Sequence, residues 1–107
     1  MLVAETFKAL GDPIRLEIVS RLSNGSYSTV GDLFDGLGVT RQGARKHLQV
    51  LADAELVTLQ IKGRQTEVGL EISSLATVKS FIADLELHWD KRLNALRKFV
   101  EKNNPTN

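Results

Sequence analysis

The 107-residue chain contains no cysteine, which excludes disulfide bonds, thiolate chemistry and metal sites built on cysteine. No apolar run approaches the roughly 18 residues that a transmembrane helix needs. Residues 1–8 include an acidic side chain and no long apolar stretch, so they do not form a signal peptide. We therefore expect a cytoplasmic protein that does not enter a membrane.

The sequence also lacks the motifs of common enzymes. Its serines between positions 20 and 28 do not form the nucleophile elbow of a hydrolase, and no acid–base pair stands out by its spacing. The glycine-containing segment at 36–38 is too short to cradle a phosphate and is not followed by the lysine of a phosphate-binding loop. We predict neither an enzyme nor a bound cofactor.

The residues that are present are typical of one globular domain spanning 1–107. Apolar residues make up 42% of the chain and charged residues 25%, with a formal net charge of +1. The charge is unevenly distributed, because residues 40–64 hold five basic and two acidic side chains while the rest of the chain is net negative. A local excess of positive charge of this kind steers a protein towards a polyanion.

Capping residues and apolar spacing predict the order of the elements. Asp12-Pro13 is a typical helix start, and Gly63-Arg64 separates two segments that alternate apolar and polar residues. We expect helices over about 2–10, 13–22, 30–37, 40–54 and 74–102, an extended bridge at 26–28, a β-hairpin over 56–70, and a frayed polar tail over 103–107. The second of these helices carries the apolar residues Ile14, Leu16, Ile18, Val19 and Leu22.

The segment from residue 40 to residue 51 predicts a helix with two unlike faces. Ala44, Leu48 and Leu51 form a stripe that faces a core, and the opposite face carries only basic and amide side chains. Arginine and glutamine can contact base edges in the major groove of DNA, and lysine and arginine neutralise phosphates. The preceding helix and tight turn make residues 30–54 a helix-turn-helix, and the hairpin over 56–70 follows it as a wing.

We predict DNA contacts from both the helix and the tip of the wing. For His47 two alternatives are open, a phosphate contact or a place at the edge of the core. Gly43 weakens the helix by up to about 1 kcal/mol relative to alanine, which either a close approach to DNA or sequence drift explains. The predicted DNA-binding residues are Thr40, Arg41, Gln42, Gly43, Arg45, Lys46, His47, Gln49, Lys62 and Arg64.

The last helix carries a long apolar stripe that one small core cannot cover. Burial against a second copy of the chain is the simplest solution, and a groove for a different partner protein is the alternative. The predicted members of a homodimer interface on this helix are Leu85, Trp89, Leu93, Leu96 and Val100. Asp84 and His88 lie one turn apart on the same helix, but the chain has only two histidines, so we predict no metal site.

Three segments resemble the ArsR-type (ArsR/SmtB-like) family of winged-helix transcriptional repressors. They are the Pro-Xaa-Arg helix start within residues 7–18, the basic helix with Ala54-Glu55-Leu56-Val57, and residues 89–96, which resemble a metal-independent branch. The resemblance implies a mainly α-helical winged helix-turn-helix with a small β-hairpin and with dimerisation helices at both termini, Val3 and Phe7 contributing from the first.

The same resemblance implies a homodimeric repressor or autorepressor that binds a palindromic operator in double-stranded DNA in a prokaryotic cell. It does not identify an inducer, and a metal-responsive sensor of the same fold is an alternative. At Glu55 many relatives have glycine, because the chain adopts a left-handed conformation there. We therefore expect the basic helix of this chain to end differently.

Overall fold

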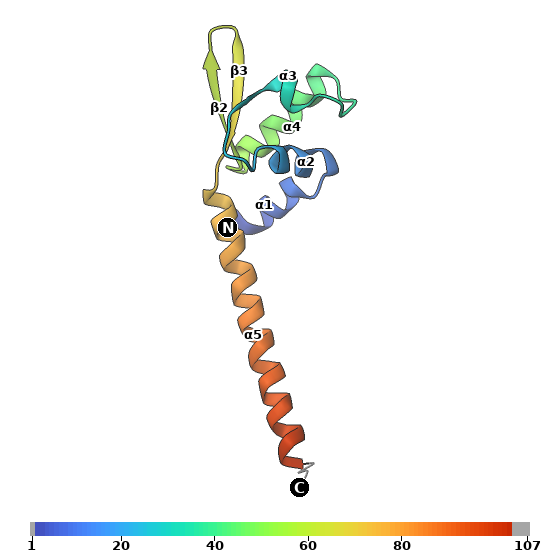
Figure 1. The fold of residues 1–107 in the computed structure, drawn as a ribbon, viewed down its shortest axis with the longest axis vertical. Helices are drawn as coiled ribbons and strands as arrows, with labels where there is room; N and C mark the ends of the chain where they lie inside the picture. The colour runs from blue at the N-terminus through green and yellow to red at the C-terminus, as the bar shows by residue number, and fades with distance from the viewer. Residues whose placement is uncertain (1, 104–107) are drawn as a thin grey trace.

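A computed structural model describes residues 2–103 and shows a mainly helical winged helix-turn-helix with a long C-terminal helix (Figure 1), which confirms the predicted fold class. Residues 104–107 of the predicted tail lie outside the described residues, whereas Asn103, which was also assigned to the tail, belongs to the last helix. The elements in chain order are α1 (Leu2–Leu10), α2 (Pro13–Arg21), β1 (Ser28–Thr29), α3 (Val30–Leu33), α4 (Arg41–Asp53), β2 (Val57–Lys62), β3 (Gln65–Leu70) and α5 (Ser73–Asn103).

The wing is a three-stranded antiparallel sheet in the order β1-β3-β2, one strand more than the predicted hairpin. The expected extended bridge at 26–28 overlaps β1 only at Ser28, which pairs with Val68 of β3. Tyr27 lies over the sheet at Gly69, where a Cβ atom would come within 2.6 Å of the tyrosine ring. The Tyr27 hydroxyl group lies 3.3 Å from that of Thr58, which pairs with Gly69. Because Gly69 has no side chain, the Tyr27 ring can lie over β3 and reach Thr58 of β2, which holds the β1 end of the sheet against the other two strands.

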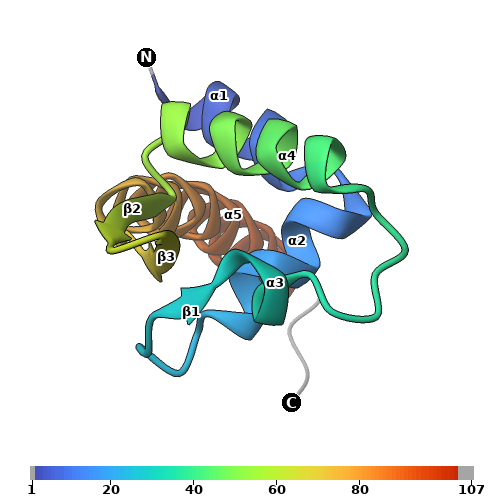
Figure 2. The ribbon, with the colours of Figure 1, turned by 90° about the horizontal axis from the view of Figure 1, so that it is seen from above.

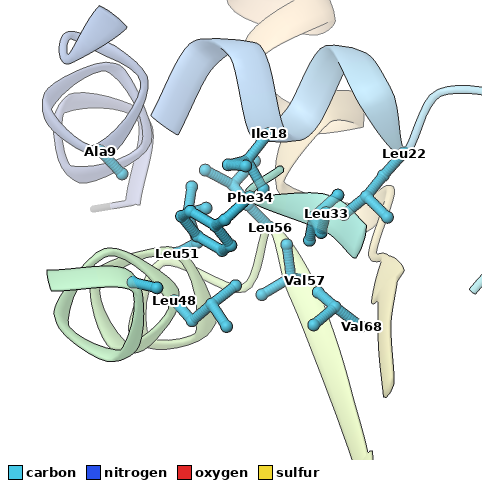
Figure 3. Packing of buried hydrophobic residues seen from close by; sticks show 11 residues of the cluster. Ala9, Ile18, Leu22, Leu33, Phe34, Leu48, Leu51, Leu56, Val57 and Val68 are labelled. Atoms are coloured by element: carbon cyan, nitrogen blue, oxygen red, sulfur yellow. The ribbon is translucent and has the colours of Figure 1, made fainter. Parts of the chain in front are cut away.

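The core lies where α2, α3 and α4 meet the base of the wing (Figure 3). Ile18, Leu22 and Leu51 are completely buried there, together with Leu56 and Val68. Leu16, another apolar residue of α2, lies outside this core and is 54% exposed. It lies two positions from Ile18, and residues two apart point to different sides of a helix.

Helix α3 is shorter than predicted, ending at Leu33 rather than at residue 37. Thr29 caps its first turn, and Gly36 and Gly38 adopt positive φ values of 78° and 68° in the turn that leads to α4. The guanidinium group of Arg21 donates hydrogen bonds to the carbonyl groups of Leu33 and Asp35 at 3.0 and 2.8 Å. This arginine therefore fixes the turn of the helix-turn-helix.

Helix α5 leaves the compact head of the molecule and projects away from it, with the wing at the opposite end (Figure 1). Viewed from above, the turns of α5 follow one another behind the wing and α2 (Figure 2). Its first turns pack against α1, and the buried Ser74 donates a 2.7 Å hydrogen bond to the carbonyl group of Ala54 at the end of α4. None of the described helices is long and apolar enough to cross a membrane.

Candidate nucleic-acid interface

Helix α4 has the two faces that its sequence predicts. Ala44, Leu48 and Leu51 are at most 4% exposed and pack into the core. The other face carries exposed side chains with no acidic residue in the first turn. Four exposed side chains of this face form no hydrogen bond or ion pair within the described part of the chain, namely those of Arg41, Gln42, Arg45 and Lys46.

Thr40 caps α4, and Gly43 belongs to this cap. The amide of Gly43 donates a 3.0 Å hydrogen bond to Oγ1 of Thr40. A Cβ atom at position 43 would lie 3.2 Å from the same Oγ1 atom and 3.6 Å from Cγ1 of Val39. The glycine thus leaves room for the cap, which is a local reason for its presence that the sequence did not reveal.

The wing carries its two cations at its tip. Gly63 has a φ of 62° in the turn between β2 and β3, which places Lys62 and Arg64 on either side of the tip. Nζ of Lys62 lies 3.4 Å from Oε1 of Glu67, whereas Arg64 has no ion pair among the described residues. Arg64 is therefore the freer of the two side chains to contact a phosphate group.

Helices α3 and α4 and the wing border an open hollow of about 900 Å³. Arg41 and Arg45 line it from α4, and Arg64 lines it from the wing. Asp35 is the single acidic residue in its lining, so the hollow has a net positive charge. Gln49 also faces it, although its Nε2 donates a 2.8 Å hydrogen bond to Oδ1 of Asp53. Gln42 and Lys46 lie outside the hollow on the exposed surface of α4.

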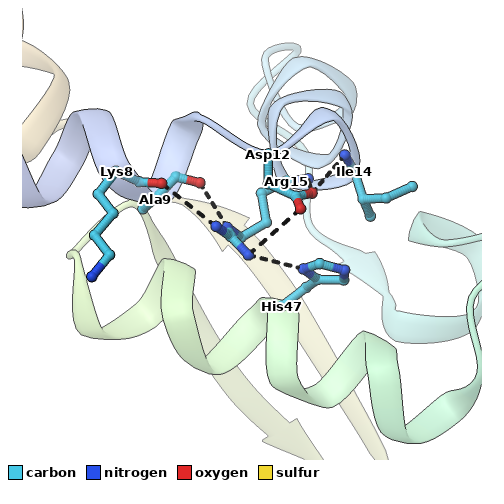
Figure 4. Close-up of polar contacts among 6 residues, drawn as sticks. All are labelled: Lys8, Ala9, Asp12, Ile14, Arg15 and His47. Carbon is cyan, nitrogen blue, oxygen red and sulfur yellow. Dashed lines mark hydrogen bonds and ion pairs between the residues drawn. The ribbon is translucent and has the colours of Figure 1, made fainter.

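His47 lies at the edge of the core beside Arg15 (Figure 4). Nη1 of Arg15 is 3.2 Å from Nδ1 of His47, which must accept the hydrogen bond because a guanidinium group only donates. Nε of the same arginine donates to the carbonyl group of Ala9 at 2.7 Å. Arg15 therefore connects the end of α1 to the middle of α4. A phosphate contact by His47 stays a prediction.

Asp12 completes this network as the cap of α2. Its Oδ1 atom accepts hydrogen bonds from the amides of Ile14 and Arg15 at 2.8 and 3.1 Å. These bonds, that of Arg15 above all, hold the pKa of Asp12 below its ordinary value of 3.8, and the nearby Arg15 guanidinium acts in the same direction. The ionised carboxylate thus orients the arginine that contacts α4.

The expectation that α4 ends differently from a glycine-terminated helix is wrong. Glu55 has a φ of 57°, the left-handed conformation that glycine favours. Its amide donates to the carbonyl group of Ala52 at 3.0 Å, and the amide of Leu56 donates to Leu51 at 2.9 Å. This is the Schellman pattern, completed by the contact between the buried Leu51 and Leu56. Burial of this leucine pair offsets the strain at Glu55.

The predicted interface residues of the last helix are all exposed in the single chain, with fractional exposures of 47–60% at Leu85, Trp89, Leu93, Leu96 and Val100. Phe7 of α1 packs edge-on against Phe81 at a ring distance of 6.0 Å, and Val3 is half-buried. Asp84 and His88 are exposed, and no group of three or more candidate metal ligands occurs among the described residues.

Two positioning residues escaped sequence reasoning. The interactions of Arg21 and Ser74 join segments that are 12 and 20 residues apart in the chain. No local pattern announces such contacts, because their acceptors are backbone carbonyl groups supplied by other elements. Arg15 had a signal in the Pro-Xaa-Arg start of α2, but its contact with His47 depends on the packing of α4.

A basic helix beside a cationic wing on a small helical head defines the class of winged helix-turn-helix regulators. Comparisons with known proteins agree, since a helix-turn-helix domain model matches residues 10–60. The chain is 32% identical over 95 residues to the HTH-type transcriptional regulator Rv2034 of Mycobacterium tuberculosis, covering 89% of this chain and 85% of that protein. It is also 41% identical over 59 residues to the arsenical resistance operon repressor of Bacillus subtilis, covering 55% of this chain and 56% of the repressor.

Among solved structures, an ArsR-like transcriptional regulator from Rhodococcus sp. RHA1 superimposes with a TM-score of 0.76 at 28% identity and 92% coverage of both chains. The chain belongs to the ArsR family of helix-turn-helix transcriptional regulators. It is accordingly a regulator of transcription and not an enzyme.

Proposed function

We propose that this protein is a homodimeric repressor, or autorepressor, that binds a palindromic operator through α4 and the tip of the wing. The observation that carries the proposal is the hollow in which Arg41, Arg45 and Arg64 converge from two separate elements. The similarity to a repressor of an arsenical resistance operon supports repression in particular. In a dimer, two α4 helices would enter successive major grooves about 34 Å apart.

In this proposal, some residues of α4 contact bases and others contact phosphates. Arg41, Gln42 and Arg45 contact base edges, since arginine pairs with guanine and glutamine with adenine through two hydrogen bonds. Thr40 and Lys46 contact phosphates and hold the register of the helix in the groove. Lys62 and Arg64 at the tip of the wing likewise contact phosphates and position the protein on the DNA.

Two substitutions separate base contacts from phosphate contacts. Arg45→Ala should weaken operator binding by about 1–3 kcal/mol and leave non-specific binding less affected. Lys46→Ala should weaken binding to all sequences and lower the salt slope by about one unit. Titrations of labelled DNA at several salt concentrations measure both effects, with Lys102→Ala at the far end of α5 as the control. Unchanged affinity and salt slope in both α4 variants would refute the assignment.

The homodimer is tested by two matched leucines of α5. Leu93 lies on the apolar stripe, whereas the equally exposed Leu87 lies on the other side of the helix, with exposures of 47% and 53%. Leu93→Glu should yield monomers in sedimentation experiments, and Leu87→Glu should leave the dimer intact. A monomeric wild-type protein would instead favour the alternative, a partner protein seated on the stripe.

We further propose that DNA binding is independent of divalent metal ions. The chain contains no cysteine and only two histidines, which leaves too few side chains for a sensor site of imidazole and thiolate ligands. Operator affinity should therefore be the same with zinc and with a chelator. Release of DNA by zinc, abolished by His88→Ala, would establish the metal-sensor alternative.

A further inference from the structure

The face of the wing that borders the hollow, called here its inner face, carries an apolar row that runs beyond the core. Side chains alternate between the two faces of a strand, so Val57, Leu59 and Ile61 of β2 share one face. Their exposed fractions are 4%, 43% and 81%, rising from the base of the wing towards its tip. Ile61 is more exposed than any other large apolar side chain in the described part of the chain. The row therefore ends in a side chain that its own chain leaves uncovered.

The register of the sheet places Ile61 next to the hollow. Ile61 pairs with Thr66 of β3, and directly opposed residues of antiparallel strands project to the same face. Thr66 and Leu59 both line the hollow, together with Arg64 from the tip of the wing. Ile61 thus extends the wall that the wing contributes to the hollow.

The fold does not require isoleucine at this position. Threonine is also favoured in strands, and it occupies positions 58 and 66 of the same two strands. The outer face of the wing is polar near the tip, where Nζ of Lys62 lies 3.4 Å from Oε1 of Glu67. An exposed apolar side chain stabilises a protein only when another surface removes it from water. Ile61 therefore indicates a contact with a second molecule.

The charges around Ile61 indicate that this molecule is DNA. Arg41 and Arg45 line the hollow from α4, and Arg64 lines it from the wing. A phosphate backbone held between these cations would have the major groove on the side of α4 and a minor groove on the side of the wing. Deoxyribose C–H groups form the walls of the minor groove, and an apolar side chain can contact them without burying an unpaired polar group.

We infer that Ile61 enters the minor groove beside each half-site and disfavours G·C pairs there. This inference rests on the proposed function and adds a specificity-determining residue to it. Guanine carries an amino group, N2, in the minor groove, and contact with Ile61 would leave this donor without a hydrogen-bond partner. A·T pairs have no such donor, and A·T-rich segments have a narrower groove that brings both sugar walls closer to the side chain.

Selection from a random DNA library provides the first test and supplies the probes. The wild type should enrich A·T pairs next to the half-sites, whereas Ile61→Thr should enrich the same half-sites with little preference in these flanking pairs. Threonine is also β-branched, so the strand is retained. Ile72→Thr is the matched control, since it makes the same change at a 66% exposed isoleucine beyond the base of the wing. This variant should keep the flanking preference.

Inosine tests whether the contact lies in the minor groove. An inosine·cytosine pair presents the major-groove edge of G·C but lacks the N2 amino group. Replacing one flanking A·T pair of an enriched duplex by G·C should weaken wild-type binding about fivefold. Inosine·cytosine at the same position should restore most of the affinity, and Ile61→Thr should bind all three duplexes nearly equally.

The salt dependence of binding separates the contact of Ile61 from phosphate contacts. An apolar contact releases no counterions, so Ile61→Thr should leave the salt slope unchanged. Arg64→Ala at the tip of the same wing should lower this slope by about one unit. A reduced slope in Ile61→Thr would show that the substitution displaces the cations of the wing, and it would overturn the inference.

The remaining outcomes separate this inference from the proposed function. Discrimination against G·C that persists in Ile61→Thr would overturn the role of Ile61, as would an inosine duplex bound as weakly as the G·C duplex. Uracil in place of the flanking thymines removes only methyl groups of the major groove. A loss of wild-type affinity with uracil, absent in Ile61→Thr, would place Ile61 in the major groove and also overturn the inference. Failure of the wild type to enrich any sequence would refute the proposed function itself.

Discussion

The head of the molecule and the distal part of α5 are built from the same kinds of residues in opposite environments. In the head, Ile18, Leu22 and Leu51 are completely buried, and arginines such as Arg15 bind backbone carbonyl groups of other elements. Along distal α5 the apolar side chains are about half exposed, and Arg97 contacts only its own helix.

The two regions meet within a single helix. The apolar spacing of three and four residues runs through α5 without interruption, yet Val78 is 8% exposed and Leu85 is 53% exposed. Periodicity therefore identifies which side of a helix must be covered, but the covering element can lie inside or outside the chain.

Leu22→Ala and Leu96→Ala remove the same atoms from the two regions. Leu22→Ala should lower the free energy of unfolding by about 2–5 kcal/mol at any protein concentration, because it leaves a cavity in a closed core. The effect of Leu96→Ala should depend on concentration, since the side chain is covered only on association. Urea unfolding at low and high protein concentration distinguishes the two. Concentration-independent losses of equal size would mean that Leu96 is covered within its own chain.

A second pair of variants compares the arginines. Arg15→Ala should lower the free energy of unfolding by about 1.5–3 kcal/mol, because the carbonyl group of Ala9 and Nδ1 of His47 lose a charged donor. Arg97→Ala should change it by less than about 0.5 kcal/mol in dilute, monomeric protein, as is usual for exposed ion pairs. Thermal and urea unfolding measure both. A loss of stability in the Arg97 variant as large as in the Arg15 variant would contradict the comparison.

Features that depend on neighbouring residues in the chain could be predicted from the sequence, whereas those that depend on contacts between distant segments could not. The two faces of α4 and the hairpin at Gly63 are encoded locally by spacing and turn residues, and both were predicted. Strand β1 was missed because its two residues become a strand only by pairing with β3. Likewise, Thr40, Arg41 and Arg45 could be found from the sequence. Their convergence with Arg64 on one hollow depends on how the wing packs beside α4.

Glu55, at the end of α4, is a position where head stability can be raised. Glu55→Gly should increase the free energy of unfolding by about 1 kcal/mol, because glycine adopts the left-handed conformation without the steric cost that a side chain incurs. Glu71→Gly outside the left-handed region is a suitable control and should not stabilise the head. Equilibrium unfolding in urea provides the measurement, and a destabilised Glu55→Gly variant would show that the Glu55 side chain contributes more than its backbone strain costs.

The Asp12 cap of α2 makes the stability of the head slightly dependent on pH. Asp12 has its pKa lowered in the folded chain by the amides of Arg15 and Ile14, so it binds a proton more readily when unfolded. Its contribution to stability is therefore fully present above the ordinary value of 3.8 and is lost as the pH falls through that value towards the lower folded pKa. Asp12→Asn keeps a capping oxygen without the charge, so the fall in stability with acid should be less steep. Asp84→Asn on distal α5, where the carboxylate makes no capping contact, should leave the loss of stability at acidic pH unchanged. The free energy of unfolding is measured between neutral and acidic pH for the wild type and both variants. If it falls equally steeply with acid in Asp12→Asn and in the wild type, protonation of this cap does not contribute to acid unfolding.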